Sequence, residues 1–126
     1  MSKTLILGPN VPKTLLPFSP AVRAGDWVFF SGQASVDLEG NIINASFEEE
    51  CRRSFENLKL IMDAAGVGPG DIVQVRNYVS KQEYLPAFNA IYKEFFSPPY
   101  PARTTLIGCL GDLLKFEVDA VAYVKH

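Results

Sequence analysis

The segment from Lys115 to Val124 carries the most regular pattern in the chain, because every second side chain in it is apolar. The apolar series consists of Phe116, Val118, Ala120, Ala122 and Val124. The other series consists of Lys115, Glu117, Asp119, Val121 and Tyr123. A period of two predicts a β-strand that turns one face toward a hydrophobic core. The chain must therefore build a sheet that other elements cover on one face.

Two helices are predicted to provide that cover. Ser46 and Glu49 are predicted to form a capping box, in which the serine hydroxyl accepts from the amide of Glu49 and the glutamate reaches back. Apolar residues then recur at helical spacing until Gly66, which is a typical left-handed stop. The second helix is expected to begin between Glu83 and Leu85 and to run to about Phe96.

The β-prone segments are Thr4–Leu7, Ala21–Arg23, Trp27–Ser31, Ile72–Val79, Arg103–Cys109 and Lys115–Val124. The last two are predicted to form a hairpin around Leu110-Gly111-Asp112. This order predicts an α+β fold with a mostly antiparallel six-stranded sheet and two helices on one face. At this length we expect a single domain over residues 1–126.

The face of the sheet away from the helices is expected to be partly apolar. The run from Trp27 to Phe30 is apolar at both parities, and Val121 and Tyr123 add to the same face. A soluble monomer rarely leaves such a patch open. The pattern therefore predicts a homo-oligomer that buries the free faces of its sheets.

Composition excludes several classes of function. A net charge of −2 without basic runs argues against nucleic-acid binding, and no apolar run approaches the length of a membrane span. Two cysteines without a recognisable secretory signal suit a reducing, cytoplasmic location. The one histidine is His126, which argues against histidine-dependent triads and most metal sites.

Arg103 and Glu117 are the strongest chemical candidates. Three prolines at positions 98, 99 and 101 stiffen the approach to Arg103, and a guanidinium binds a carboxylate through two parallel hydrogen bonds. The alternative is a surface arginine or a structural ion pair. Glu117, in a strand rich in apolar residues, is expected to hold a water as a general base, or else to pair with a cation at an interface. The hairpin would place it opposite about Thr105, on the face of Arg103 and roughly 7–10 Å away.

Several ordered motifs resemble the RidA/YjgF family. The most specific is Pro99-Tyr100-Pro101-Ala102-Arg103-Thr104-Thr105, followed by Phe116-Glu117-Val118-Asp119-Ala120-Val121-Ala122. Shorter matches are Pro17-Phe18-Ser19-Pro20-Ala21-Val22, Phe30-Ser31-Gly32-Gln33 and Phe88-Asn89-Ala90-Ile91-Tyr92. Together they extend over nearly the whole chain.

This resemblance implies a chorismate-mutase-like (ferredoxin-like) fold, a homotrimer with clefts between subunits, and no metal or organic cofactor. It also implies hydrolysis of reactive enamines and imines, such as 2-aminoacrylate and 2-iminobutanoate, to 2-oxo acids and ammonia. Arg103 would bind the substrate carboxylate and Glu117 would position the attacking water. Ser31 and Asn89 would line the pocket.

Two further pocket positions depart from the deaminase pattern of the family. Phe18 replaces a tyrosine, and Thr105 replaces a frequent cysteine. The resemblance therefore leaves open which imine or enamine is hydrolysed. A non-catalytic protein that binds carboxylate metabolites is the alternative, while a nuclease or translation inhibitor, as some members of this endoribonuclease L-PSP group are described, fits the composition poorly.

Overall fold

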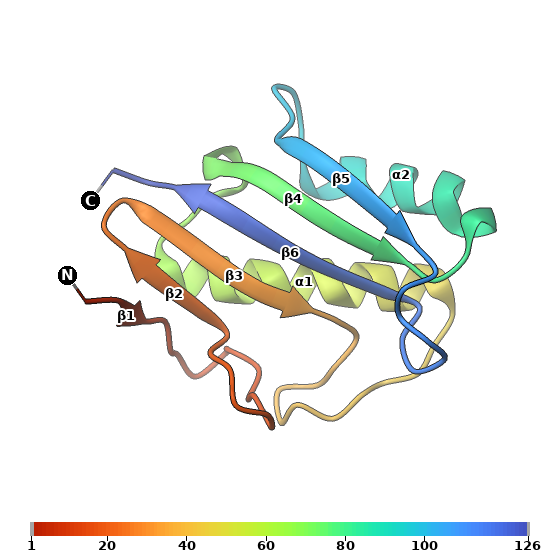
Figure 1. Cartoon of the computed structure of the whole chain (residues 1–126), viewed down its shortest axis with the longest axis horizontal. Helices are drawn as coiled ribbons and strands as arrows, with labels where there is room; N and C mark the ends of the chain where they lie inside the picture. The colour runs from red at the N-terminus through yellow and green to blue at the C-terminus, as the bar shows by residue number, and fades with distance from the viewer. Residues whose placement is uncertain (1, 126) are drawn as a thin grey trace.

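The fold is a six-stranded sheet with two helices on one face, as expected for the α+β class. A computed structural model describes residues 2–125. The strands are β1 (Thr4–Leu5), β2 (Ala21–Ala24), β3 (Trp27–Gln33), β4 (Ile72–Val79), β5 (Ala102–Ile107) and β6 (Phe116–Tyr123). The helices are α1 (Phe47–Ala65) and α2 (Leu85–Phe95), and both lie behind the sheet in Figure 1. Short 3-10 turns at Pro69–Asp71 and Gln82–Tyr84 precede β4 and α2.

The strand order is β1-β2-β3-β6-β4-β5, so the predicted hairpin of the last two strands is wrong. β5 pairs in parallel with β4, and β6 lies antiparallel between β3 and β4. The cause is α2, because a strand that follows a crossover helix returns parallel to the strand before it. The chain then passes the end of β4, where the Gly108 amide donates to Val79 and the Ser80 amide donates to Lys115, and enters the centre of the sheet (Figure 1).

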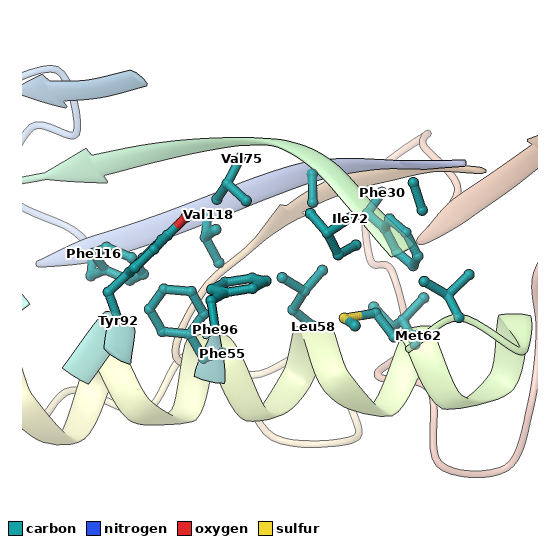
Figure 2. Close-up of a cluster of buried hydrophobic side chains, with 14 of the residues drawn as sticks. Phe30, Phe55, Leu58, Met62, Ile72, Val75, Tyr92, Phe96, Phe116 and Val118 are labelled. Carbon is teal, nitrogen blue, oxygen red and sulfur yellow. The ribbon is translucent and has the colours of Figure 1, made fainter. Parts of the chain in front are cut away.

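One hydrophobic core fills the space between the helices and the sheet (Figure 2). The apolar series of β6 faces this core, as its alternation predicts, and Phe116, Val118 and Ala122 are fully buried. The Phe116 ring lies 5.3 Å from Phe55 of α1 and 5.5 Å from Phe88 of α2, measured between centroids. Strand β6 therefore packs against both helices.

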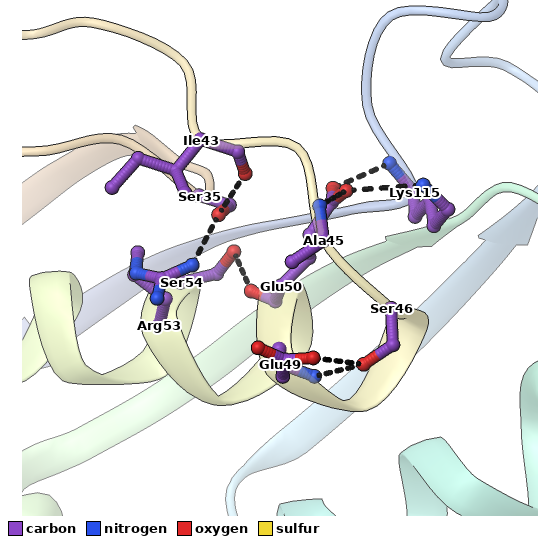
Figure 3. Close-up of polar contacts among 9 residues, drawn as sticks. All are labelled: Ser35, Ile43, Ala45, Ser46, Glu49, Glu50, Arg53, Ser54 and Lys115. Carbon is purple, nitrogen blue, oxygen red and sulfur yellow. Dashed lines mark hydrogen bonds and ion pairs between the residues drawn. The ribbon is translucent and has the colours of Figure 1, made fainter.

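Helix α1 begins and ends where the sequence predicts. The Ser46 hydroxyl accepts from the amide of Glu49 at 3.2 Å, and Gly66 closes the helix with φ of 71°. The returning contact differs from a full capping box, because the Glu49 carboxylate accepts from the Ser46 hydroxyl at 3.0 Å (Figure 3). Helix α2 begins at Leu85, within the predicted range, and Pro86 lies in its first turn, where a proline is tolerated.

A buried carboxylate ties the start of α1 to the entrance of β6 (Figure 3). Glu50 is 0% exposed and accepts from the backbone amides of Ala45 and Lys115, each at 3.0 Å. It also forms an ion pair with the Lys115 ammonium group at 3.2 Å. Because Lys115 lies two residues before Glu117, this contact helps to fix where Glu117 emerges on the sheet.

The face of the sheet opposite the helices, called the open face below, keeps large apolar side chains in contact with solvent. Trp27, Phe29 and Tyr123 are 44%, 45% and 43% exposed. The rings of Trp27 and Tyr123 meet edge to face with centroids 4.9 Å apart. The homo-oligomer that this pattern predicts stays a prediction. Within residues 2–125, no helix is long and apolar enough to cross a membrane.

Candidate active site

The predicted site residues lie around two separate hollows. Phe18, Ser31 and Glu117 line a hollow of about 610 Å³, called the Glu117 hollow, between the open face and the segment before β2. Arg103 and Asn89 line a smaller hollow of about 210 Å³, called the Arg103 hollow, beside α2. Thr105 lines neither of them.

Arg103 and Glu117 point to opposite faces of the sheet, which contradicts the prediction that they share one. Arg103 is in register with Val75, which is fully buried against the helices, whereas Glu117 is in register with Tyr78 on the open face. Two strand spacings and three residues of rise separate their Cα atoms by roughly 14 Å. The error follows from the wrong hairpin, since β4 lies between the two strands.

The Glu117 carboxylate is partly buried and has no hydrogen bond or ion pair with any of residues 2–125. Burial raises the pKa of Glu117 above its ordinary value, and the negative charge of Asp119 raises this pKa further. A carboxylate with free oxygens and a raised pKa is suited to hold a water and accept its proton.

Gly32 makes room for this carboxylate, a role that the sequence analysis missed. A Cβ at Gly32 would overlap the Glu117 carboxylate. The ladder between β3 and β6 is irregular between Phe30 and Gln33, so Gly32 lies where the strand departs from regular pairing. The available signal was an isolated glycine within a strand, which often marks a bulge or a close approach.

Ser31 and Phe18 form part of the wall of the Glu117 hollow. The Ser31 hydroxyl donates to the carbonyl oxygen of Ser19 at 2.6 Å, so its proton is engaged and its lone pairs can accept from a ligand. Phe18 is 47% exposed and offers an apolar ring with no hydroxyl.

Beside Glu117, three polar side chains of the open face form a network. Asp119 accepts from the Arg76 Nε at 2.9 Å through one carboxylate oxygen and from the Tyr78 hydroxyl at 2.8 Å through the other. Burial, together with the hydrogen bond to Asp119, raises the pKa of Tyr78 to about 12, so its hydroxyl stays protonated as a donor. Arg76 and Asp119 line the Glu117 hollow. An exposed strand arginine carries no sequence signal that would have identified Arg76.

On the other face, the Arg103 guanidinium lies against two aromatic rings of α2. Its central carbon is 5.0 Å from the centroid of Phe88 and 4.9 Å from that of Tyr92. It forms no hydrogen bond or ion pair within residues 2–125, so its donors stay available for an anion. The Phe88–Tyr92 spacing of four residues on one helix face was the signal for this platform.

The surroundings of Arg103 contain unpartnered polar atoms. The Tyr92 hydroxyl lies buried at the Arg103 hollow without a hydrogen bond, and burial raises the pKa of this group. Asn89 lies exposed on α2 beside it. Thr105, two residues after Arg103 and in register with the fully buried Asn77, keeps its hydroxyl oxygen without a partner. Thr105 is therefore on the same face as Arg103, although it does not line the Arg103 hollow.

Among residues 2–125, no group of three or more His, Cys, Asp or Glu side chains could hold a metal ion. His126 lies outside the described residues.

The two hollows differ in the chemistry that they offer. The Glu117 hollow provides a carboxylate that can hold a water, and the Arg103 hollow provides a guanidinium that can bind an anion.

Known proteins resemble the chain over nearly all of its length. The model of a family described as Endoribonuclease L-PSP matches residues 8–124. A 2-iminobutanoate/2-iminopropanoate deaminase of Salmonella typhimurium is 34% identical over 126 residues, which cover 97% of this chain and 98% of the relative. A protein of the same name from Dermatophagoides farinae is 30% identical and covers 98% of both chains. The crystal structure of RidA from an Antarctic Psychrobacter has a TM-score of 0.88 at 27% identity and covers 96% of this chain and 99% of that one.

Proposed function

The chain belongs to the endoribonuclease L-PSP family, which includes RidA, and we propose that it hydrolyses reactive imines and enamines of 2-oxo acids. The observation that carries the proposal is the unpaired Glu117 carboxylate, partly buried in a hollow that can admit a small molecule. Relatives named as deaminases of 2-iminobutanoate and 2-iminopropanoate supply the reaction class. The free thiols of Cys51 and Cys109 suit a reducing compartment such as the cytoplasm.

The reaction needs positioning and a single proton carrier. Arg103 binds the substrate carboxylate and thereby fixes the neighbouring C=N carbon. A water on Glu117 attacks this carbon, so that an O–C bond forms while the π electrons move to nitrogen, and Glu117 accepts the proton of the water. Glu117 then gives this proton to nitrogen, which completes a carbinolamine. Glu117 next accepts the proton of the new hydroxyl group and passes it to the amine, so that the C=O bond forms as the C–N bond breaks, and ammonia and a 2-oxo acid leave. Proton transfer of this kind contributes about 10²–10⁴-fold.

Two copies of the chain are proposed to complete each site. A 2-imino acid of three or four carbons is too small to bridge residues on opposite faces of one sheet, but the Arg103 hollow borders the edge strand β5. That edge can meet the Glu117 hollow of another copy. Such a contact is heterologous and closes into a ring if the rotation allows it. The exposed apolar open face supports the assembly, and the family resemblance points to a homotrimer.

An assay of imine hydrolysis tests the function. 2-Iminobutanoate generated in situ should yield 2-oxobutanoate and ammonia faster with the protein than without it, and Arg103→Ala should lower kcat/KM by about 10²-fold, since a charged hydrogen-bonded contact is lost. Arg52→Ala is the matched control, because Arg52 is a half-exposed arginine paired with Glu94 between the helices. If the Arg103→Ala variant were as active as the Arg52→Ala variant, the role proposed for Arg103 would be refuted.

The second candidate is a protein that binds carboxylate metabolites without turning them over. It is favoured by Phe18, which brings no hydroxyl, and by Ser31, whose proton is already engaged. Binding of 2-oxobutanoate that depends on Arg103, together with no acceleration of imine hydrolysis, would establish this candidate over the deaminase.

A further inference from the structure

Among the described residues, Arg76 is held by Asp119 through its Nε, while its two terminal nitrogens keep their hydrogen-bond donors free. Its Nε donates to Asp119, which the Tyr78 hydroxyl holds through the other carboxylate oxygen. The Arg76 side chain is 56% exposed, whereas that of Asp119 is 15% exposed, so the acid is the less exposed partner and the arginine projects further toward solvent. The two terminal nitrogens of Arg76 form no hydrogen bond with any of residues 2–125. They present a planar fork that matches a carboxylate.

The fork lies close to the group that is proposed to hold the water. Arg76 is in register with Asp119, and Glu117 is in register with Tyr78, so Arg76 and Glu117 are diagonal neighbours on the open face. Diagonal neighbours have side chains starting roughly 7–8 Å apart, within reach of an arginine. The other cation lining the Glu117 hollow, Lys13, is paired with Glu39 at 2.7 Å. Lys13 carries a single ammonium nitrogen, so among the described residues that line this hollow Arg76 is the one that offers a carboxylate two nitrogens in a planar fork.

We propose that Arg76 binds a second carboxylate of the substrate, and that the substrate is the imine of a 2-oxo dicarboxylic acid of four or five carbons. This inference rests on the proposed function. Arg103 of a neighbouring copy would bind the carboxylate next to the imine carbon, and Glu117 would deliver water to that carbon. One or two methylene groups would then extend the distal carboxylate along the open face to Arg76.

The charges of the Glu117 hollow fit this assignment. Glu117 and Asp119 would repel a doubly charged substrate if they acted alone. Arg76 offsets part of the charge of Asp119 through the ion pair, and both residues line the hollow. A substrate with a short alkyl tail, such as 2-iminobutanoate, leaves this fork without a partner, whereas a distal carboxylate satisfies it.

The test compares kcat/KM for 2-iminosuccinate, 2-iminoglutarate and 2-iminobutanoate, each generated in situ by an oxidase acting on the corresponding amino acid. The wild type should prefer at least one dicarboxylic imine. Arg76→Gln should reduce this preference about 10- to 100-fold, because hydrogen bonds to a charged group are lost, and Arg76→Lys should restore part of it. Arg52→Ala, which removes a comparably exposed paired arginine, should leave the preference unchanged.

Affinities for 2-oxoglutarate and 2-oxobutanoate, measured by calorimetry on the same variants, separate this inference from the proposed function. If the affinity for 2-oxoglutarate relative to that for 2-oxobutanoate is lower in Arg76→Gln than in the wild type, the second carboxylate site is supported. This holds even if no imine is turned over, and in that case only the deaminase proposal fails. Turnover of 2-iminobutanoate with the same preferences in wild type and Arg76→Gln overturns this inference and leaves the deaminase proposal standing. Circular dichroism of Arg76→Gln checks that the fold is intact.

Discussion

Glu117 lies in surroundings that favour its protonated form. Its carboxylate is partly buried beside Gly32, and the negative charge of Asp119 is two residues away on the same face. Both effects raise the pKa of Glu117, and the burial is the larger of the two. A base works only when it is ionised, so kcat/KM should rise with pH through this raised pKa.

Asp119→Asn should move that rise to lower pH, because the substitution removes the negative charge that raises the Glu117 pKa. The measurement is the pH profile of kcat/KM for imine hydrolysis. Glu117→Gln should remove the rise and lower the rate about 10²–10⁴-fold. Glu48→Gln, which changes an exposed acid in the first turn of α1 away from this hollow, is the control and should not move the profile. A profile of Asp119→Asn that moves to higher pH would contradict this assignment.

At the residue scale, the sequence singles out candidate residues but does not predict their surroundings. Arg103 and Glu117 were recognisable because a guanidinium and a carboxylate stand in motifs of a known family. Arg76 gave no such signal, since its proposed role depends on an ion pair across the ladder of β4 and β6. The spacing of Phe88 and Tyr92 indicates that the two rings share a helix face, but it does not indicate that this face lies against Arg103.

At the scale of elements, β6 depends on contacts made far away in the chain. Glu50, near the start of α1, accepts from the amide of Lys115 at the entrance of β6 and from the amide of Ala45 in the loop before the helix. It also pairs with the Lys115 ammonium group. One side chain thus satisfies two backbone donors that would otherwise lie partly buried without partners.

Glu50→Ala should destabilise the protein by about 3 kcal/mol, because it removes one member of a buried ion pair and leaves those amides unsatisfied. The expected loss lies at the lower end of what removal of one partner of a buried ion pair costs, because the Lys115 side chain is 38% exposed. Urea unfolding measures the change. Glu48→Ala, on the exposed side of the same turn, should cost no more than about 1 kcal/mol. Equal losses in the two variants would show that the Glu50 contacts contribute little.

Elements with strong local signals were predicted well, whereas their pairing was not. The Ser46 cap and Gly66 define α1, and the alternation of β6 gives its buried face. The hairpin prediction was wrong because turn residues around Gly111 indicate a change of direction but not the next partner. The parallel return of β5 after α2 decides the arrangement, and the rule for crossover helices could have indicated it.

At the scale of the whole molecule, the two halves of the candidate site face away from each other. The Arg103 hollow lies on the side of the helices, and the Glu117 hollow lies on the open face. A catalytic unit built from these halves therefore requires contact between copies. The apolar side chains of the open face, such as Trp27 and Phe29, give those copies a surface to bury.

Mixing two inactive variants tests this requirement. Arg103→Ala and Glu117→Gln, unfolded and refolded together in equal amounts, should recover activity, because a site between two chains can take each intact half from a different variant. With random assembly, about a quarter of the sites would carry both groups. Each variant refolded alone is the control. Mixed assemblies seen by native mass spectrometry without recovered activity would place both groups of a working site in one chain.

The position of β6 also bears on how the protein is made. This strand comes last among the strands in chain order, yet it is the one that joins β3 to β4. Until a ribosome has released it, the two parts of the sheet have no backbone contact with each other, and β3 and β4 each expose an unpaired edge. The nascent chain must therefore wait for its final strand before the sheet can close, and during translation those edges are open to wrong partners or to chaperones.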